Sequence, residues 1–139
     1  MLDFLKKKKT RVIIDTNFLM LPGSRGIDIF SEIAKLMNEP HELCIVDKTL
    51  EELQTIILKD GKKKDGFNAK LGFILAKQKS LKTLTSSKEE YVDSAIVRIA
   101  SQSPKKTIVA TQDKELQGEL KKLSVRIITI KQQKQLALR

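Results

Sequence analysis

The hexapeptide Val12-Ile13-Ile14-Asp15-Thr16-Asn17 places three branched apolar residues directly before a carboxylate. A β-branched run bounded by a charged block and by the turn signal Pro22-Gly23-Ser24 is typical of a short buried strand, here over residues 11–15. An ionisable residue at the end of a buried strand loses hydration, which costs free energy. Asp15 is therefore the first candidate functional residue.

The rest of the chain alternates between the apolar spacing of helices and that of strands. Helices are predicted over residues 27–38, from Asp47 or Thr49 onward, after a charged turn at 59–66, from Ser87 onward and over 114–123. Further strands are predicted over residues 42–46, 81–84, 107–110 and 125–130. Strands that alternate with helices favour an α/β fold in which helices cover both faces of a parallel sheet.

Three local features of this pattern give more detailed predictions. The helix after the charged turn is expected to bury Leu71, Ile74 and Leu75. Ser87 and Glu90 have the spacing of a capping box that would open the following helix. The tail from Lys131 onward is expected to be frayed or weakly helical.

The length and charge of the chain limit what it can be. The 139 residues are expected to form one domain, with a basic amino-terminal segment (1–10) and a basic carboxyl-terminal tail (131–139). The 27 Lys and Arg residues outnumber the 17 Asp and Glu residues, so the net charge is +10 at pH 7. This excess favours a polyanionic partner such as nucleic acid, although basic proteins without such a partner are common.

Cysteine usage and hydropathy indicate the compartment. The only cysteine, Cys44, lies in an apolar run and has no internal disulfide partner, which fits a reducing, cytoplasmic environment. The apolar stretch behind Lys6–Lys9 ends at Asp15, which is too short for a signal peptide. No segment approaches the length of a membrane span, so no membrane partner is expected.

Four acidic residues are the candidate site: Asp15, Glu52, Asp93 and Asp113. Sites in open parallel sheets form beyond the carboxyl ends of the strands, where the strand order reverses. Asp15 ends the first strand, and Asp113 comes three residues after the strand at 107–110. Glu52 and Asp93 are expected in the first turns of helices that begin at the same edge. If the first strand and the 107–110 strand are neighbours, all four carboxylates can face one crevice.

Each acid also has a structural explanation. Thr49 and Glu52 have capping-box spacing, Asp93 can offset a helix dipole, and Asp113 can cap the helix that follows it. The joint arrangement favours a metal site instead, because two carboxylates about 4 Å apart repel by roughly 4 kcal/mol at an effective dielectric near 20. Clustered acids therefore imply Mg²⁺ or Mn²⁺. Zinc is not expected, because His41 and Cys44 are the only candidate nitrogen and sulfur ligands.

The four acidic motifs together resemble those of the PIN-domain nucleases. The matching pieces, in the order and spacing of that family, are Ile14-Asp15-Thr16-Asn17, Glu52-Leu53, Asp93-Ser94-Ala95-Ile96 and Thr111-Gln112-Asp113. The resemblance extends from residue 11 to about residue 130 and is greatest to small archaeal single-domain PIN proteins related to ribosomal RNA-processing nucleases. Two positions depart from the common pattern: Gln112 stands where Asn is frequent, and Ser94 stands where many members carry a second acid.

The resemblance implies a three-layer α/β/α sandwich with a central parallel sheet of about five strands. It also implies cleavage of RNA that depends on one or two Mg²⁺ or Mn²⁺ ions. Carried over by position, Asp15, Glu52, Asp93 and Asp113 would be the catalytic metal ligands, with Asn17 and Thr111 supporting them. Glu51 is a rival to Glu52, and Ser94 leaves the number of ions open.

The basic residues suggest where RNA would bind. Lys62, Lys63 and Lys64, in the charged turn near the second motif, are the best candidates for phosphate contacts. Contacts with about four to six phosphates would give a salt dependence of four or five log units per log unit. The aromatic residues are few, namely Tyr91 and five Phe; most of the Phe are expected in the core, and a platform for base stacking is not visible.

Three functions are compatible with these residues, and a fourth is disfavoured. The first is a metal-dependent endoribonuclease of RNA maturation, including ribosomal RNA, for which a ribosome precursor is a possible partner. The second is the VapC-type toxin ribonuclease of a toxin–antitoxin pair, with an antitoxin protein as partner. The third is a catalytically weak PIN fold that binds RNA or the ribosome, and a homodimer is expected by analogy for any of these. A haloacid-dehalogenase-like enzyme is disfavoured because Asp15-Thr16-Asn17 lacks that family's second acid.

Overall fold

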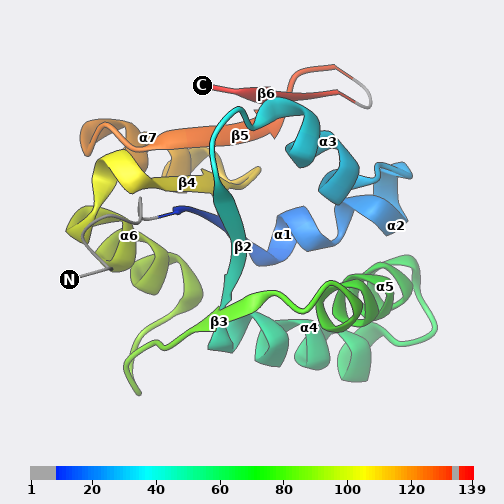
Figure 1. The fold of residues 1–139 in the computed structure, drawn as a ribbon. Helices are drawn as coiled ribbons and strands as arrows, with labels where there is room; N and C mark the ends of the chain where they lie inside the picture. The colour runs from blue at the N-terminus through cyan, green and yellow to red at the C-terminus, as the bar shows by residue number, and fades with distance from the viewer. Residues whose placement is uncertain (1–8, 133–134) are drawn as a thin grey trace.

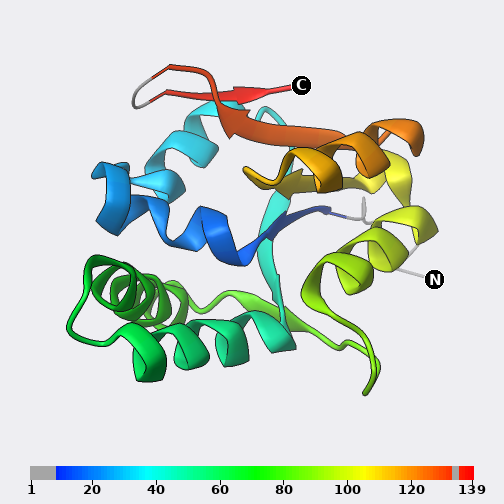
Figure 2. The same cartoon turned by 180° about the vertical axis from the view of Figure 1, so that it is seen from behind.

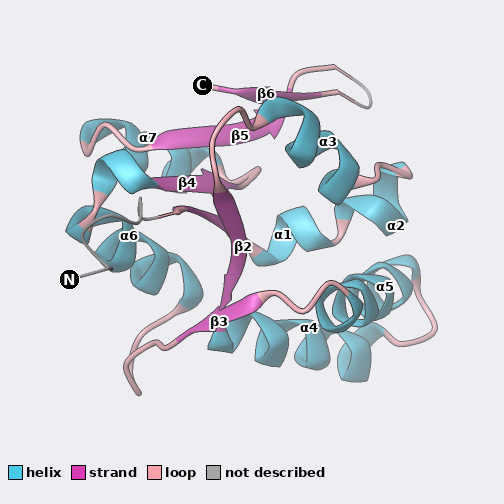
Figure 3. Ribbon diagram, in the orientation of Figure 1, coloured by secondary structure: helices cyan, strands magenta, loops and turns pink. Residues whose placement is uncertain are grey.

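The computed structural model describes residues 9–132 and 135–139, which build a sheet with helices on both faces (Figures 1 and 2). The six strands of the sheet are β1 (Thr10–Ile14), β2 (His41–Val46), β3 (Lys82–Leu84), β4 (Thr107–Ala110), β5 (Arg126–Ile130) and β6 (Leu136–Leu138). Their order is β3-β2-β1-β4-β5-β6, and every neighbouring pair is parallel except β5 and β6 (Figure 3).

The helices fall into two groups. One face carries α1 (Thr16–Leu19), α2 (Leu21–Arg25), α3 (Ile29–Leu36), α4 (Asp47–Asp60) and α5 (Lys64–Gln78). The other face carries α6 (Val92–Gln102) and α7 (Lys114–Lys122), and a 3₁₀ turn at Pro104–Lys106 precedes β4. No helix among the described residues is long and apolar enough to cross a membrane.

The side chains of β1 show how the two layers form. Val12 and Ile14 pack against the five-helix face, and Ile13 points to the α6–α7 face, as expected from the period of a strand. All three residues are fully buried. The three-layer α/β/α prediction is therefore confirmed, with six strands in the sheet instead of about five.

The additional strand comes from the carboxyl-terminal tail, where the prediction of a frayed or weakly helical end is wrong. β6 pairs antiparallel with β5, and its register places Leu136 opposite Ile130. The backbone of Arg139 exchanges hydrogen bonds of 2.7 and 2.9 Å with Ile127. The tail can do this because the edge of β5 offers free backbone groups and because Leu136 reaches the core.

The segment predicted as a turn at Pro22-Gly23-Ser24 lies instead within the short helix α2, which follows the short helix α1. Asp15 accepts the backbone N–H of Thr16 and opens α1, and Pro22 lies in the first turn of α2, where proline is tolerated. Gly26, with φ of 65°, ends α2 in the left-handed conformation that glycine adopts readily. The helix predicted over 27–38 is present as α3.

Two helix predictions also need correction. α5 buries Gly66, Asn68, Ala69, Gly72 and Ala76, whereas Leu71 and Leu75 are half-buried and Ile74 is exposed. Small residues face inward because α5 lies close to its neighbours. α6 begins at Val92 and not at the predicted capping box, although the Ser87 N–H does donate to Glu90 at 2.8 Å.

The sheet order explains where a site can form. The chain runs from β1 outward to β2 and β3, then returns to the other side of β1 with β4. Ile14 pairs with Ala110 at the carboxyl ends of these two parallel strands. The condition that β1 and β4 are neighbours is thus met, and the strand order reverses between them, where open α/β sheets form their binding crevices.

Candidate functional site

Asp15 lies directly after β1 and receives hydrogen bonds from three directions. The Thr16 N–H donates to Oδ1 at 2.8 Å, while Thr111 Oγ1 and Asn17 Nδ2 donate to Oδ2 at 2.7 and 3.3 Å. The side chain is buried, with 7% of the residue exposed. Because all three contacts are donors, the position is built for an acceptor such as a carboxylate.

Thr111 and Asp113 come from the segment after β4. The Thr111 hydroxyl accepts the Asp113 N–H at 3.1 Å while it donates to Asp15, so it links the two acids. Asp113 Oδ1 also accepts the N–H groups of Glu115 and Leu116 and caps α7, as the structural explanation predicted. Capping uses only one of its oxygens, and Asp113 still lines the same cleft as Asp15.

Glu52 extends from α4 toward α1. Its Oε1 accepts a hydrogen bond from Thr16 Oγ1 at 2.5 Å, which joins the second motif to the residue after Asp15. The predicted capping box with Thr49 is wrong because α4 already begins at Asp47 and Thr49 lies within it. Among the described residues, the Thr49 hydroxyl is buried without a hydrogen-bond partner.

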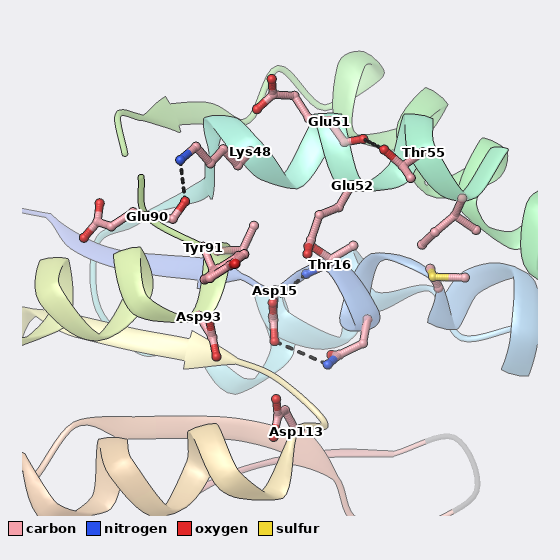
Figure 4. Close-up of a pocket in the computed structure, with 14 residues that line it drawn as sticks. Asp15, Thr16, Lys48, Glu51, Glu52, Thr55, Glu90, Tyr91, Asp93 and Asp113 are labelled. Atoms are coloured by element: carbon pink, nitrogen blue, oxygen red, sulfur yellow. Dashed lines mark hydrogen bonds between the residues drawn. The ribbon is translucent and has the colours of Figure 1, made fainter. Parts of the chain in front are cut away.

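Asp93 is the second residue of α6 and its Oδ1 accepts the Ser94 N–H at 2.9 Å. Figure 4 shows Asp15, Asp93 and Asp113 gathered from three different elements, with Glu52 reaching in from α4. All four acids line one cleft of about 810 Å³. Their predicted role as metal ligands stays a prediction, but the topology brings them to one place.

The cleft also contains residues that the sequence reasoning missed or set aside. Glu51, Glu90 and Lys48 contribute to its walls, and Tyr91 lies at its rim with 78% of the residue exposed. The expectation that most Phe residues lie in the core holds for Phe18 and Phe30, which are buried, but not for Phe67, which is 63% exposed. The sequence could have indicated that Tyr91 lies near the site, because it comes two residues before Asp93.

The electrostatics of the cleft centre on Asp15. Burial raises the pKa of Asp15 above its ordinary value, while the hydrogen bonds from Thr111 and Thr16 oppose the rise. The negative charges of Glu52 and Asp113 raise the pKa further, which shows that these carboxylates act on one another. A cation between them would relieve both the desolvation and the repulsion.

The donor set fits Mg²⁺ or Mn²⁺ in kind, because every candidate ligand is a carboxylate, amide or hydroxyl oxygen. Within residues 9–132 and 135–139, no three His, Cys, Asp or Glu side chains already stand close enough together to hold an ion by themselves. This spacing suits an ion that keeps several waters and uses few protein ligands, as Mg²⁺ does. Cys44 is buried in the core, and its pKa is raised to about 11 by desolvation, so it is no ligand here.

Asn17 and Gln112 hold the two loops of the site together. Asn17 Oδ1 accepts the Gln112 N–H at 3.1 Å, while its amide nitrogen contacts Asp15. Gln112 Oε1 in turn accepts the Ile130 N–H at 3.0 Å, which fixes the loop to the end of β5. Gln112, one of the two departures from the family pattern, therefore has a structural role in this chain.

If the acids hold a metal ion for RNA cleavage, as the family resemblance implies, replacing Thr111 by Val should lower that cleavage by about tenfold to a hundredfold, because residues that orient metal ligands typically contribute this much. Valine keeps the shape but neither donates to Asp15 nor accepts the Asp113 N–H. Thr111→Ser should restore most of the activity. The measurement is the cleavage rate at saturating metal; equal rates for Val and Ser would contradict the role of the hydroxyl.

Lys62, Lys63 and Lys64 do not lie in the acidic cleft. They are exposed in the turn between α4 and α5 and line a separate hollow with Phe67 and Asn68. From Glu52 to the end of α4 at Asp60 the helix rises about 12 Å, and Lys62 follows beyond that end. Of the basic amino-terminal segment predicted at 1–10, residues 1–8 lie outside the described residues.

An open, mostly parallel α/β/α sheet with four acids from four motifs in a cleft at the strand reversal defines a nuclease-like domain class. The chain belongs to the PIN-like domain family: the model of a "PIN like domain" matches residues 12–133. It is 32% identical over 125 residues to "Ribonuclease VapC4" of Methanocaldococcus jannaschii, covering 89% of this chain and 92% of that protein. The predicted family resemblance is confirmed.

Solved structures agree with this assignment. The structure described as the PIN domain endonuclease Utp24 superposes with a TM-score of 0.76 at 26% identity, covering 93% of this chain and 90% of that chain. A domain of a functionally unknown protein from Methanocaldococcus jannaschii has a TM-score of 0.58 at 16% identity, with coverage of 88% and 92%, and shows the shared fold.

Proposed function

We propose that this protein is a divalent-metal-dependent endoribonuclease that hydrolyses RNA phosphodiester bonds. The observation that carries the proposal is the convergence of Asp15, Glu52, Asp93 and Asp113 in one cleft of a strongly basic chain. Its support from comparison is the similarity to proteins named as a ribonuclease and a PIN domain endonuclease. Acids suit a hard metal, and the net positive charge of the chain attracts the phosphate backbone.

The four acids would hold a metal ion from two sides of the cleft. Asp15 and Asp113, linked through Thr111, would hold Mg²⁺ or Mn²⁺ from the sheet side, and Glu52 and Asp93 would face them from α4 and α6. When bound, such an ion supplies charge that activates water and stabilises the leaving oxygen of a phosphodiester. Asn17 and Thr16 keep Asp15 oriented, so that its carboxylate is in place before substrate arrives.

The direct test is cleavage of a labelled single-stranded RNA by the purified protein in EDTA, and after addition of Mg²⁺ or Mn²⁺. Cleavage should be absent in EDTA and should return with either ion. The same titration followed by thermal melting should show stabilisation, about 2.7 kcal/mol when the free ion is at a hundred times its Kd. Cleavage that persists in EDTA, or melting indifferent to both ions, would refute the metal-dependent proposal.

We further infer that Lys62, Lys63 and Lys64 contact the RNA backbone beyond the cleft. Replacing all three by Ala should weaken RNA binding and reduce the salt slope by about two log units per log unit, since each phosphate contact to a single strand contributes about 0.7. A control lacking the exposed Lys105, Lys121 and Lys122 removes the same charge and should leave the slope nearly unchanged. Equal slopes for the two variants would mean that only net charge matters.

RNA maturation, including that of ribosomal RNA, is the role that we propose first. The toxin ribonuclease of a toxin–antitoxin pair is a second candidate, favoured by the identity to Ribonuclease VapC4. The two roles differ in what expression does to a cell. A maturation nuclease should leave growth intact, whereas a toxin should arrest growth until an antitoxin protein is supplied.

A further inference from the structure

The segment of residues 85–91, which joins β3 to α6, is tied to the start of α4 by Lys48. The Lys48 ammonium donates to the backbone oxygens of Ser87 at 2.6 Å and Lys88 at 2.9 Å, and also to that of Glu90. Figure 4 draws the contact to Glu90. One cation thus satisfies three carbonyls of a single loop, using all three of its donors.

Further contacts hold both ends of the same loop. Asp47 Oδ1 accepts the N–H and the hydroxyl of Ser86 at 3.1 and 2.6 Å. Arg98 of α6 donates to both carboxylate oxygens of Glu90, at 2.7 and 3.1 Å, and lowers the pKa of Glu90 to about 2. The loop is therefore fixed to α4 on one side and to α6 on the other.

This anchored loop presents Tyr91 at the rim of the acidic cleft. Tyr91 is 78% exposed, although it lines the cleft together with Asp93 and Glu52. A large aromatic side chain left in water gains nothing for folding, because burial is what makes such side chains stabilising. A ring held at a fixed place beside a candidate active site is instead a surface for a ligand.

The charges in the cleft make a neutral contact necessary. Six acids line it, namely Asp15, Glu51, Glu52, Glu90, Asp93 and Asp113. Lys48 is its one basic lining residue in the described part of the chain, and its ammonium is engaged by the loop carbonyls. The cleft therefore offers no free basic side chain to bind the nucleotide next to the reacting phosphate in the described part of the chain. Stacking of a base on an aromatic ring needs no charge.

We propose that Tyr91 stacks on the base of a nucleotide adjacent to the scissile phosphate. The proposal rests on the proposed ribonuclease function and adds to it a residue that contacts the substrate: the base at this position must be unpaired to reach the ring of Tyr91. A paired base is covered by its neighbours in the helix and cannot reach the ring. Tyr91 is thus a specificity-determining residue, and Lys48 is the residue that positions it.

The chain offers a direct spectroscopic readout of this contact. It contains one tyrosine and no tryptophan, so its intrinsic fluorescence reports on Tyr91 alone. Single-stranded RNA should quench this emission in a saturable manner, and a blunt duplex of the same sequence should not. Binding of the single strand, detected by anisotropy of a labelled RNA, without any change in Tyr91 emission would overturn the proposal.

Substitutions separate stacking from other roles. Tyr91→Ala should weaken binding of single-stranded RNA about tenfold to a hundredfold, which is the usual effect of removing one stacked aromatic. Tyr91→Phe keeps the ring and should bind nearly as the wild type does. A loss in Tyr91→Phe as large as that in Tyr91→Ala would assign the effect to the hydroxyl and overturn stacking.

An abasic scan identifies the base concerned and isolates this proposal from the nuclease proposal. Removing one base next to the cleavage site should slow cleavage by the wild type but add nothing in Tyr91→Ala, because both changes delete the same contact. Additive losses would overturn the stacking contact while leaving the ribonuclease intact. A wild type that neither binds nor cleaves RNA would instead remove the proposed function, and the stacking proposal with it.

Discussion

Replacing Asp15 by Asn should abolish RNA cleavage and at the same time raise the melting temperature of the metal-free protein. The loss of activity should exceed a hundredfold, because even residues that only orient metal ligands contribute tenfold to a hundredfold. The gain in stability follows from burial: the charged carboxylate is desolvated and repelled by Glu52 and Asp113. Asparagine has the same size and no charge, so it removes both costs; its NH2 group replaces one accepting oxygen, and we expect that lost acceptor to cost less.

The pH dependence of folding stability should also differ between the wild type and Asp15→Asn. The folded-state pKa of Asp15 is raised above its ordinary value of 3.8, so the folded protein holds this proton more tightly than the unfolded chain does. The stability contributed by Asp15 is therefore complete below pH 3.8 and is lost as the pH rises through the raised folded pKa. In Asp15→Asn this loss should disappear, which widens the difference in melting temperature toward neutral pH.

Glu119→Gln is the matched control, because Glu119 is an exposed acid on α7 outside the cleft. It should leave both cleavage and melting close to those of the wild type. Addition of Mn²⁺ should stabilise the wild type and the Glu119 variant but not Asp15→Asn. An Asp15→Asn protein that cleaves RNA normally would remove Asp15 from the site. If Asp15→Asn melts lower than the wild type in EDTA, the three hydrogen bonds that the carboxylate accepts stabilise the protein more than its desolvation destabilises it.

The parts of the fold that the sequence predicts well are those governed by strand periodicity and buried runs. The run Val12–Ile14 sits at the centre of the sheet, and the segments at 42–46, 107–110 and 125–130 are strands nearly as predicted. The convergence of Asp15 and Asp113 follows from the same pattern, because β1 and β4 are parallel neighbours. Such features follow from the apolar pattern of each strand and from the rule that sites in open parallel sheets form where the strand order reverses.

The parts that escape prediction depend on contacts between distant segments. α5 buries small residues because its backbone approaches other helices, whereas the spacing of its large apolar residues favours a different face, that of Leu71, Ile74 and Leu75. β6 exists because β5 offers an unpaired edge. The loop that carries the exposed Tyr91 is held by Lys48 of α4, which bonds to Ser87 over 39 residues, and by Arg98 of α6, which donates to the backbone oxygen of Thr85 over 13 residues. These are tertiary effects that override local propensity.

Gly72→Ala should cost about 1–3 kcal/mol of folding stability, the usual range for overpacking, although alanine is normally favoured over glycine in a helix. A Cβ at position 72 would lie 2.5 Å from the backbone oxygen of Leu19, and a backbone oxygen cannot rotate away as a side chain can. Either α5 or α1 must therefore move. α1 carries Thr16, whose hydroxyl bonds to Glu52 of the acidic cleft, so cleavage should fall as well.

Gly118→Ala is the matched control for this prediction, since Gly118 lies in α7 and a Cβ there meets no atom within 4 Å. The same chemical change should stabilise the protein by roughly 0.5–1 kcal/mol through helix propensity alone. Thermal or urea unfolding of the two variants should thus give shifts of opposite sign. Equal stabilisation by both substitutions would mean that the close contact between Gly72 of α5 and Leu19 of α1 is not formed in solution.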